Sequence, residues 1–111
     1  MSRRILKNRR FLEYYLEADG TQRKKLLQHA NKEQIDSMCE CALNVVKRNV
    51  PIDDCTKSAL CKHKNAICEV ALKKRPLARR KKILIQKGGA FLPIILQTVL
   101  PLLASALLSK N

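Results

Sequence analysis

The sequence predicts an all-α fold, a small bundle of four to five short helices followed by a C-terminal apolar helix. Apolar residues recur at helical spacing through most of the 111 residues. Capping residues and breakers separate these periodic stretches. The chain has only three glycines and no run that alternates apolar and polar residues as a strand would. These features together argue against a β-sandwich and against a Gly-rich nucleotide-binding fold.

The first two helices are short and are separated by Asp19-Gly20. Ser2 can cap a helix that runs to about Ala18, and Thr21 can cap the next. Glycine tolerates the left-handed conformation common after a helix end, so Gly20 is expected to stop the first helix. The apolar residues of these helices are Ile5, Leu12, Tyr15, Leu16, Leu26, Leu27 and Ala30.

Asn31, with Gln34 three residues later, has the pattern of a capping box. The helix that it opens shows the clearest amphipathic spacing in the chain, and Asn49-Val50-Pro51 ends it. Its apolar face is expected to contain Ile35, Met38, Cys39, Ala42, Leu43 and Val46.

A fourth and a fifth helix complete the predicted bundle. Asp53 and Asp54 suit a helix start, where carboxylates meet the positive end of the helix dipole. Pro76 fits the first turn of a helix that runs through a basic stretch to Gly88. The fourth helix is expected to bury Leu60, Ile67, Cys68, Ala71 and Leu72. The predicted organisation is a bundle over 1–72 with a basic N-terminal segment, a basic helix over 73–87, a flexible Gly-Gly joint at 88–89 and an apolar tail helix over 90–111.

The net charge of +14 is concentrated in two segments. Residues 1–10 hold five cations and residues 73–87 hold eight, with no acid in either, whereas residues 11–72 are neutral overall. This asymmetry predicts a polyanionic partner, either nucleic acid or an anionic membrane surface. Aromatic residues make up only 4% of the chain, too few for a base-stacking platform.

Double-stranded DNA, bound without sequence preference, is the predicted partner of the cations. About eight phosphate contacts would give a salt slope of roughly −7. No helix-turn-helix reading set of Asn, Gln and Arg stands out, so base-specific readout is not expected. The basic run also resembles a nuclear localisation patch. The predicted DNA-binding residues are Arg3, Arg4, Arg9, Arg10, Lys73, Lys74, Arg75, Arg79, Arg80, Lys81, Lys82 and Lys87.

The 20 residues of 90–109 contain no charge and, as a helix, would span ~30 Å, the hydrocarbon thickness of a bilayer. Gln97, Pro101, Ser105 and Ser109 recur every four residues and would form a polar stripe, which a lipid anchor does not need. A membrane-active helix, a helix that self-associates and a helix that covers the core of a soluble protein all remain open. The candidate membrane-contacting residues are Phe91, Leu92, Ile94, Ile95, Leu96, Val99, Leu100, Leu102, Leu103, Leu107 and Leu108.

The five cysteines are odd in number, and no secretory signal is visible, so reduced thiols are expected. Buried thiols acting as small apolar side chains are favoured over a zinc site, because paired ligand spacings are absent. No Ser/His/Asp or Cys/His/Asn constellation is present. The sequence therefore predicts a non-enzyme with no cofactor and no metal.

The segment from Arg79 to Leu108 joins a basic run, Gln86-Lys87-Gly88-Gly89 and Phe91-Leu92-Pro93 with Leu-rich sequence. It is similar to the C-terminal part of adenoviral core protein X, the precursor of mu. It resembles still more closely the small basic proteins of Maverick/Polinton elements and adintoviruses. Two upstream segments, Cys39 to Val46 and His63-Lys64, also look like those proteins. The resemblance implies a virion component that condenses packaged DNA and a maturation-protease site at Gly88 and Gly89. Gln86 departs from the adenoviral consensus, which has Met, Ile or Leu there.

The leading hypothesis is a virus-like DNA-condensing core or minor capsid protein of the virion and host nucleus, whose tail contacts membrane or docks on a capsid protein. Two alternatives stay open. One is a tail-anchored protein whose cationic domain faces the cytoplasm at an intracellular membrane, since the cations before the tail fit the positive-inside rule. The other is a helical protein-interaction adaptor in which the tail belongs to the core.

Overall fold

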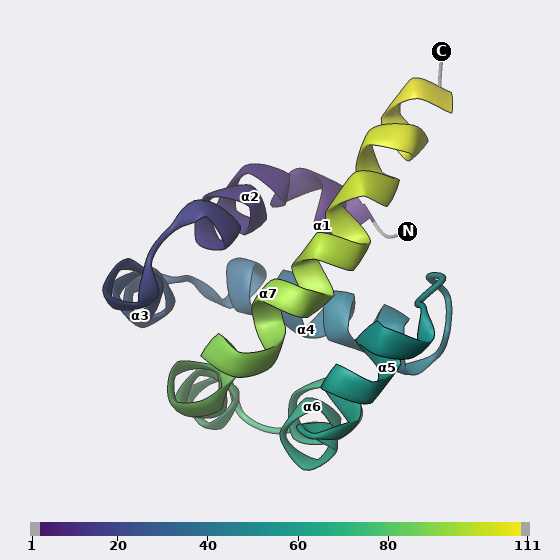
Figure 1. Cartoon of the computed structure of the whole chain (residues 1–111). Helices are drawn as coiled ribbons and strands as arrows, with labels where there is room; N and C mark the ends of the chain where they lie inside the picture. The colour runs from purple at the N-terminus through teal and green to yellow at the C-terminus, as the bar shows by residue number, and fades with distance from the viewer. Residues whose placement is uncertain (1–2, 110–111) are drawn as a thin grey trace.

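A computed structural model describes the backbone of residues 3–109 and the side chains of residues 3–103. The described chain is all helical, which confirms the predicted fold class (Figure 1). The helices are α1 (Arg3–Lys7), α2 (Arg9–Glu17), α3 (Gly20–His29), α4 (Lys32–Val46), α5 (Asp54–Cys61), α6 (Lys64–Ala71) and α7 (Leu77–Ser109).

Two predicted single helices are each divided in the structure. The first bends at Asn8, whose side-chain amide donates to the Arg4 carbonyl at 2.8 Å, so α1 and α2 are separate. The fourth bends at His63, where the backbone leaves helical geometry between α5 and α6. Leu72, which was expected in the core, is 52% exposed because α6 ends at Ala71 and the chain turns outward there.

The helix caps are set by short side chains that accept from the first turn. The capping box at Asn31 is confirmed: its side chain accepts from the Gln34 amide and the Gln34 side chain accepts from the Asn31 amide, both at 2.9 Å. The predicted cap at Thr21 is wrong, because Asp19 makes the same reciprocal pair with Gln22. Gly20 therefore begins α3 with a negative φ rather than ending the preceding helix in the left-handed region.

Helix α7 is the centre of the bundle. It crosses in front of α4 in Figure 1 and packs against α2, α3, α4, α5 and α6. Beyond the body of the bundle its ribbon continues as a free-standing end. Seven of its described side chains are completely buried: Leu84, and in the apolar segment Phe91, Leu92, Ile95, Leu96, Val99 and Leu103. The apolar segment thus supplies a large part of the core that the N-terminal helices cover.

The predicted flexible joint at Gly88 and Gly89 is not a break, because α7 runs through both residues. Gly88 is buried, and a Cβ there would lie 2.9 Å from Leu92 Cδ1. Packing of the helix against its neighbours outweighs the helix-weakening effect of two glycines, roughly 1 kcal/mol each relative to alanine. Pro93 and Pro101 lie inside α7 and have no backbone N–H to donate to the carbonyls of Gly89 and Gln97. Both of these residues are exposed, so water can donate to their carbonyls instead.

Candidate nucleic-acid interface

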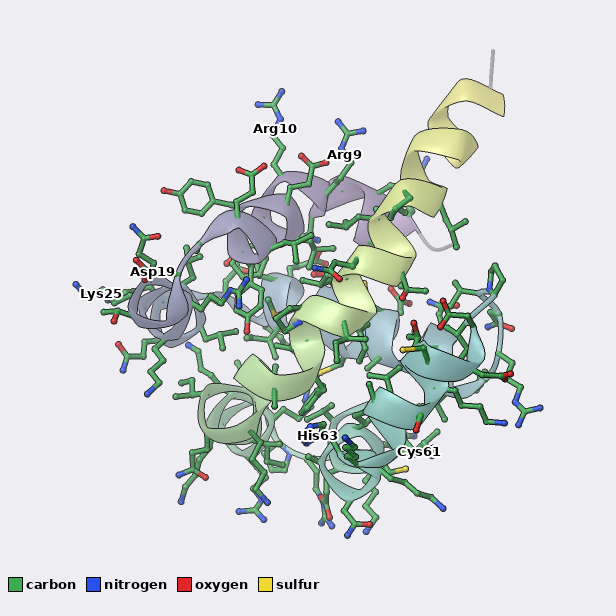
Figure 2. The ribbon with its side chains drawn as sticks, viewed as in Figure 1. Arg9, Arg10, Asp19, Lys25, Cys61 and His63 are labelled. Atoms are coloured by element: carbon green, nitrogen blue, oxygen red, sulfur yellow. The ribbon has the colours of Figure 1, made fainter. Side chains whose placement is uncertain are left out.

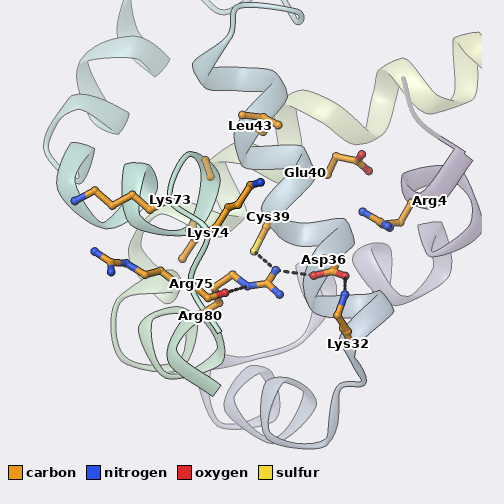
Figure 3. Close-up of a pocket in the computed structure, with 12 residues that line it drawn as sticks. Arg4, Lys32, Asp36, Cys39, Glu40, Leu43, Lys73, Lys74, Arg75 and Arg80 are labelled. Carbon is orange, nitrogen blue, oxygen red and sulfur yellow. Dashed lines mark hydrogen bonds and ion pairs between the residues drawn. The ribbon is translucent and has the colours of Figure 1, made fainter. Parts of the chain in front are cut away.

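A groove lined mainly by cations lies where α1, α4 and the α6–α7 connection meet (Figure 3). Its volume is about 490 Å³. Six cationic side chains and two carboxylates line it, together with four apolar or thiol side chains. The lining residues are Arg4, Lys32, Asp36, Cys39, Glu40, Leu43, Val70, Ala71, Lys73, Lys74, Arg75 and Arg80.

The floor of this basic groove is organised by one ion-pair network. Arg80 Nη1 lies 2.6 Å from Asp36 Oδ1 and 3.6 Å from Cys39 Sγ, and Lys32 Nζ lies 2.7 Å from Asp36 Oδ2. Burial raises the pKa of Asp36, but the hydrogen bonds from Lys32 and Arg80 outweigh it and leave that pKa below its usual value. Asp36 therefore stays ionised and fixes the Arg80 guanidinium against α4.

A second carboxylate holds the connection between α6 and α7. Glu69 accepts from Arg75 Nε at 2.9 Å and pairs with Lys73 Nζ at 3.3 Å. Its hydrogen bond with Arg75 is the main cause that lowers its pKa. The connection is thereby folded back so that Lys73, Lys74 and Arg75 lie beside α4 (Figure 3).

Four of the eight cations in 73–87 are occupied within the protein. Besides Lys73, Arg75 and Arg80, Lys81 donates to the Gln28 and Ala30 carbonyls at 2.8 and 2.9 Å. These carbonyls belong to the C-terminal end of α3, where a cation is stabilising. The sequence shows how many cations a segment has but not which of them bind other parts of the protein. The predicted set of DNA-binding residues therefore includes cations that already have partners within the protein.

The remaining predicted cations are distributed over more than one face. Arg9 Nε lies 3.3 Å from Glu13 Oε1. Figure 2 shows Arg9 and Arg10 projecting outward from α2. Only Arg4 of the N-terminal cations reaches the basic groove. The other predicted cations are exposed, and within the described part of the chain none of their side chains has a hydrogen bond or ion pair. They are Arg3, Arg4, Arg10, Lys74, Arg79, Lys82 and Lys87.

One lining cation, Lys32, was missed by sequence reasoning. It stands on α4, in the stretch 11–72 that is neutral overall and outside both cationic segments. Its spacing of four residues from Asp36 is the signal that could have found it, because a cation and an acid at that spacing meet on a helix.

The other predicted sites fall elsewhere. Gly88 and Gly89 lie in the middle of α7, so a protease that binds its substrate as an extended chain would first have to unwind this helix. Of the candidate membrane-contacting residues, Ile94, Leu100 and Leu102 are half-buried in addition to the six buried ones. Leu107 and Leu108 have side chains outside the described residues. The helical stretch Leu77–Leu103 is long and apolar enough to cross a membrane, and 44% of its most apolar 18-residue window is buried inside the bundle.

Two of the cysteines are buried as expected and the others are not. Cys39 and Cys41 lie in the core, and burial raises the pKa of the Cys41 thiol to about 12, so it stays protonated. The expectation is wrong for Cys55 and Cys61, which are exposed, while Cys68 is half-buried. Within the described residues, no group of three or more His, Cys, Asp or Glu side chains is placed to hold a metal ion.

Comparison with protein-family models, curated proteins and solved structures finds no match to the chain. The basic groove is therefore the feature of the molecule that indicates a function. The groove carries more cations than carboxylates. Asp36 in its lining pairs with Lys32 and Arg80, and Glu69, outside the lining, pairs with Lys73 and Arg75.

Proposed function

We propose that this chain is a non-enzymatic protein that binds double-stranded DNA without sequence preference through the basic groove. The observation that carries the proposal is the convergence of cations from three separate parts of the sequence. Arg4 comes from α1, Lys32 comes from α4, and the α6–α7 connection with the start of α7 supplies Lys73, Lys74, Arg75 and Arg80. Such a group of cations suits the phosphate backbone of DNA, which carries one charge per ~1.7 Å of duplex.

The side chains in the groove favour backbone contact over base reading. Arginine and lysine hold phosphates, whereas sequence is read mostly by paired Asn, Gln and Arg groups in the major groove. Asn and Gln are missing from the described lining of the groove. Among the described residues, Lys74 and Arg4 form no ion pair, while Arg80 and Arg75 are held in place by Asp36 and Glu69.

The resemblance to Maverick/Polinton and adenoviral core proteins favours packaged DNA as the ligand. We therefore propose a DNA-condensing core or minor capsid protein of a virus-like particle, acting in the virion and the host nucleus. The burial of Phe91 to Leu103 supports a tail that stabilises the fold, in preference to a tail anchor.

The affinity for DNA should fall steeply with salt, but less steeply than the total charge suggests. The groove has an excess of four cations over its carboxylates, which corresponds to a log–log slope of roughly −3.6. Raising the salt from about 50 to about 200 mM should then weaken binding roughly 150-fold. Fluorescence anisotropy with a labelled duplex of random sequence measures this slope. Absent binding, or binding that does not change with salt, would contradict the proposal.

A double variant, Arg4→Ala with Lys74→Ala, tests where the DNA lies. Each lost phosphate contact should make the slope shallower by about 1, so the double variant should lose about 2. The matched control is Lys24→Ala with Lys25→Ala, two exposed cations of α3 outside the basic groove. An equal loss in the control would mean that charge is bound anywhere on the surface.

Two cations of the basic groove, Arg80 and Lys74, should separate folding from binding. Arg80→Met removes the guanidinium from Asp36 and should lower the free energy of unfolding by about 1.5–3 kcal/mol, the usual contribution of a hydrogen bond to a charged group. Lys74→Met removes an exposed cation of the groove that has no ion-pair partner among the described residues, and should leave stability within about 0.5 kcal/mol while weakening DNA binding. Urea unfolding followed by circular dichroism checks both variants, and equal destabilisation would refute the assignment.

A further inference from the structure

A second groove lies on another part of the bundle, between the end of α4, the segment that follows it, and helices α5 and α6. Its volume is about 260 Å³. The floor is apolar: Val45, Leu60 and Ile67 are buried there, with half-buried Val46 and Ile52 beside them. We refer to it as the apolar groove.

The rim of the apolar groove carries three cations, from the segment after α4, from α5 and from α6. Arg48, Lys57 and Lys64 line it and are exposed, and none of its lining residues is an acid. Within the described residues, none of these three cations has a carboxylate partner. The positive charge of the rim is therefore not neutralised by the protein itself.

Arg48 occupies a backbone conformation that arginine adopts rarely. Its φ is 59°, the only positive value among the described non-glycine residues. It closes α4 as a Schellman turn, in which the Asn49 amide donates to the Asn44 carbonyl at 2.9 Å and the Arg48 amide donates to the Val45 carbonyl at 3.1 Å. Glycine is the usual residue at this position because it has no Cβ to strain. A cation kept at a position where the backbone favours glycine, at the rim of an apolar groove, points to a role for its side chain.

These features indicate the chemistry of an occupant. A DNA strand would be attracted by the cations, but its charged phosphates and polar sugars would then cover the apolar floor. An amphipathic helix with aliphatic side chains on one face and carboxylates beside them would satisfy both parts, since aliphatic anchors at i, i+3 and i+4 fill such grooves. Complementary charge at the rim then fixes the orientation of the helix.

We propose that the apolar groove docks an acidic amphipathic helix of a partner protein. This site is separate from the basic groove, since Arg4, Lys74 and Arg80 do not line it. The protein would then bind DNA on one surface and an acidic protein segment on another.

The test uses the full chain and a fluorescein-labelled synthetic helix of 15 residues, with Leu at helical spacing on one face and Glu on the other. Saturable binding in the micromolar range is expected by fluorescence anisotropy. Arg48→Gly should weaken it about fivefold, a size typical of one charge pair that is partly shielded from water. The variant relieves the backbone at that position, so its thermal midpoint should be unchanged or higher, which separates lost binding from lost folding. The matched control is Lys47→Ala, the adjacent cation that does not line the groove.

Two further peptides complete the design. A peptide with Ala in place of Leu should bind at least tenfold more weakly, and one with Lys in place of Glu should not bind. The proposal is overturned if the Ala peptide binds as well as the Leu peptide, or if Arg48→Gly and Lys47→Ala have equal effects. Duplex DNA is added last as a competitor of the peptide. If it displaces the peptide equally from the wild type and from the Arg4→Ala, Lys74→Ala double variant, the apolar groove would bind nucleic acid instead.

Discussion

A chain that ends at Gly89 should not fold. It lacks the six fully buried side chains of α7 from Phe91 to Leu103, on which α2, α4 and α6 pack. Burying a large aliphatic or aromatic side chain is worth about 1.5–3 kcal/mol, so the six together contribute roughly 9–18 kcal/mol. A domain of this length has a net stability of only about 5–15 kcal/mol. The truncated chain should lose its cooperative thermal transition and most of its helical circular dichroism signal.

The control for this truncation is a chain that ends at Leu103. It keeps every buried side chain that the structure describes and should unfold cooperatively like the full chain. A folded chain of residues 1–89 would instead show that the tail is a separable segment, as a tail anchor or a detachable peptide requires. The same experiment bears on cleavage at Gly88-Gly89, because the product of such a cut would be this short chain. Cleavage should therefore be coupled to loss of the bundle.

Phe91→Ala should have the largest effect of any single substitution in α7. The ring is completely buried, with its centroid 6.2 Å from that of His63. Replacing a buried phenylalanine with alanine leaves a cavity and costs about 3–5 kcal/mol. A loss of that size would bring so small a protein close to its unfolding midpoint. Urea unfolding of the variant measures the loss.

Gln97→Ala is the matched control for Phe91→Ala, since it truncates an exposed side chain of the same helix. Its free energy of unfolding should stay within about 0.5 kcal/mol of the wild type, because surface changes away from caps and networks have small effects. If both variants were equally stable, α7 would not occupy the core.

The elements that depend on neighbouring residues could be predicted from the sequence, and those that depend on distant ones could not. Asn31 with Gln34 specifies its own cap, which was found. The periodicity of α4 found four residues of its buried face, whereas the predicted Leu43 and Val46 are half-buried and Cys41 and Val45 are buried instead. The position of α7 depends on a complementary cavity made by five other helices. Its composition fits a bilayer equally well, and the polar stripe was the one local sign of a solvent face: Gln97 and Pro101 are indeed exposed.

The candidate site shows the same division. The two cationic segments were visible as charge, and Arg4 does meet Lys73 to Arg80 in one groove. The pairing of Arg80 with Asp36, 44 residues apart, is a tertiary contact with no trace in local spacing. The apolar groove was not predicted, since its floor comes from three helices and its rim from single cations in a neutral stretch.

The central place of α7 constrains the order of folding during synthesis. The helices made first, α1 to α4, leave their apolar faces exposed until residues up to Leu103 have been made, which at about 5–20 residues per second takes several seconds. We expect ribosome-bound chains to become resistant to protease only when α7, followed by a flexible linker, has left the exit tunnel. Chains arrested with the linker after Gly89 should stay sensitive, and early resistance would contradict this. The last segment to be made therefore closes the bundle, and until then the newborn protein is a candidate client for chaperones.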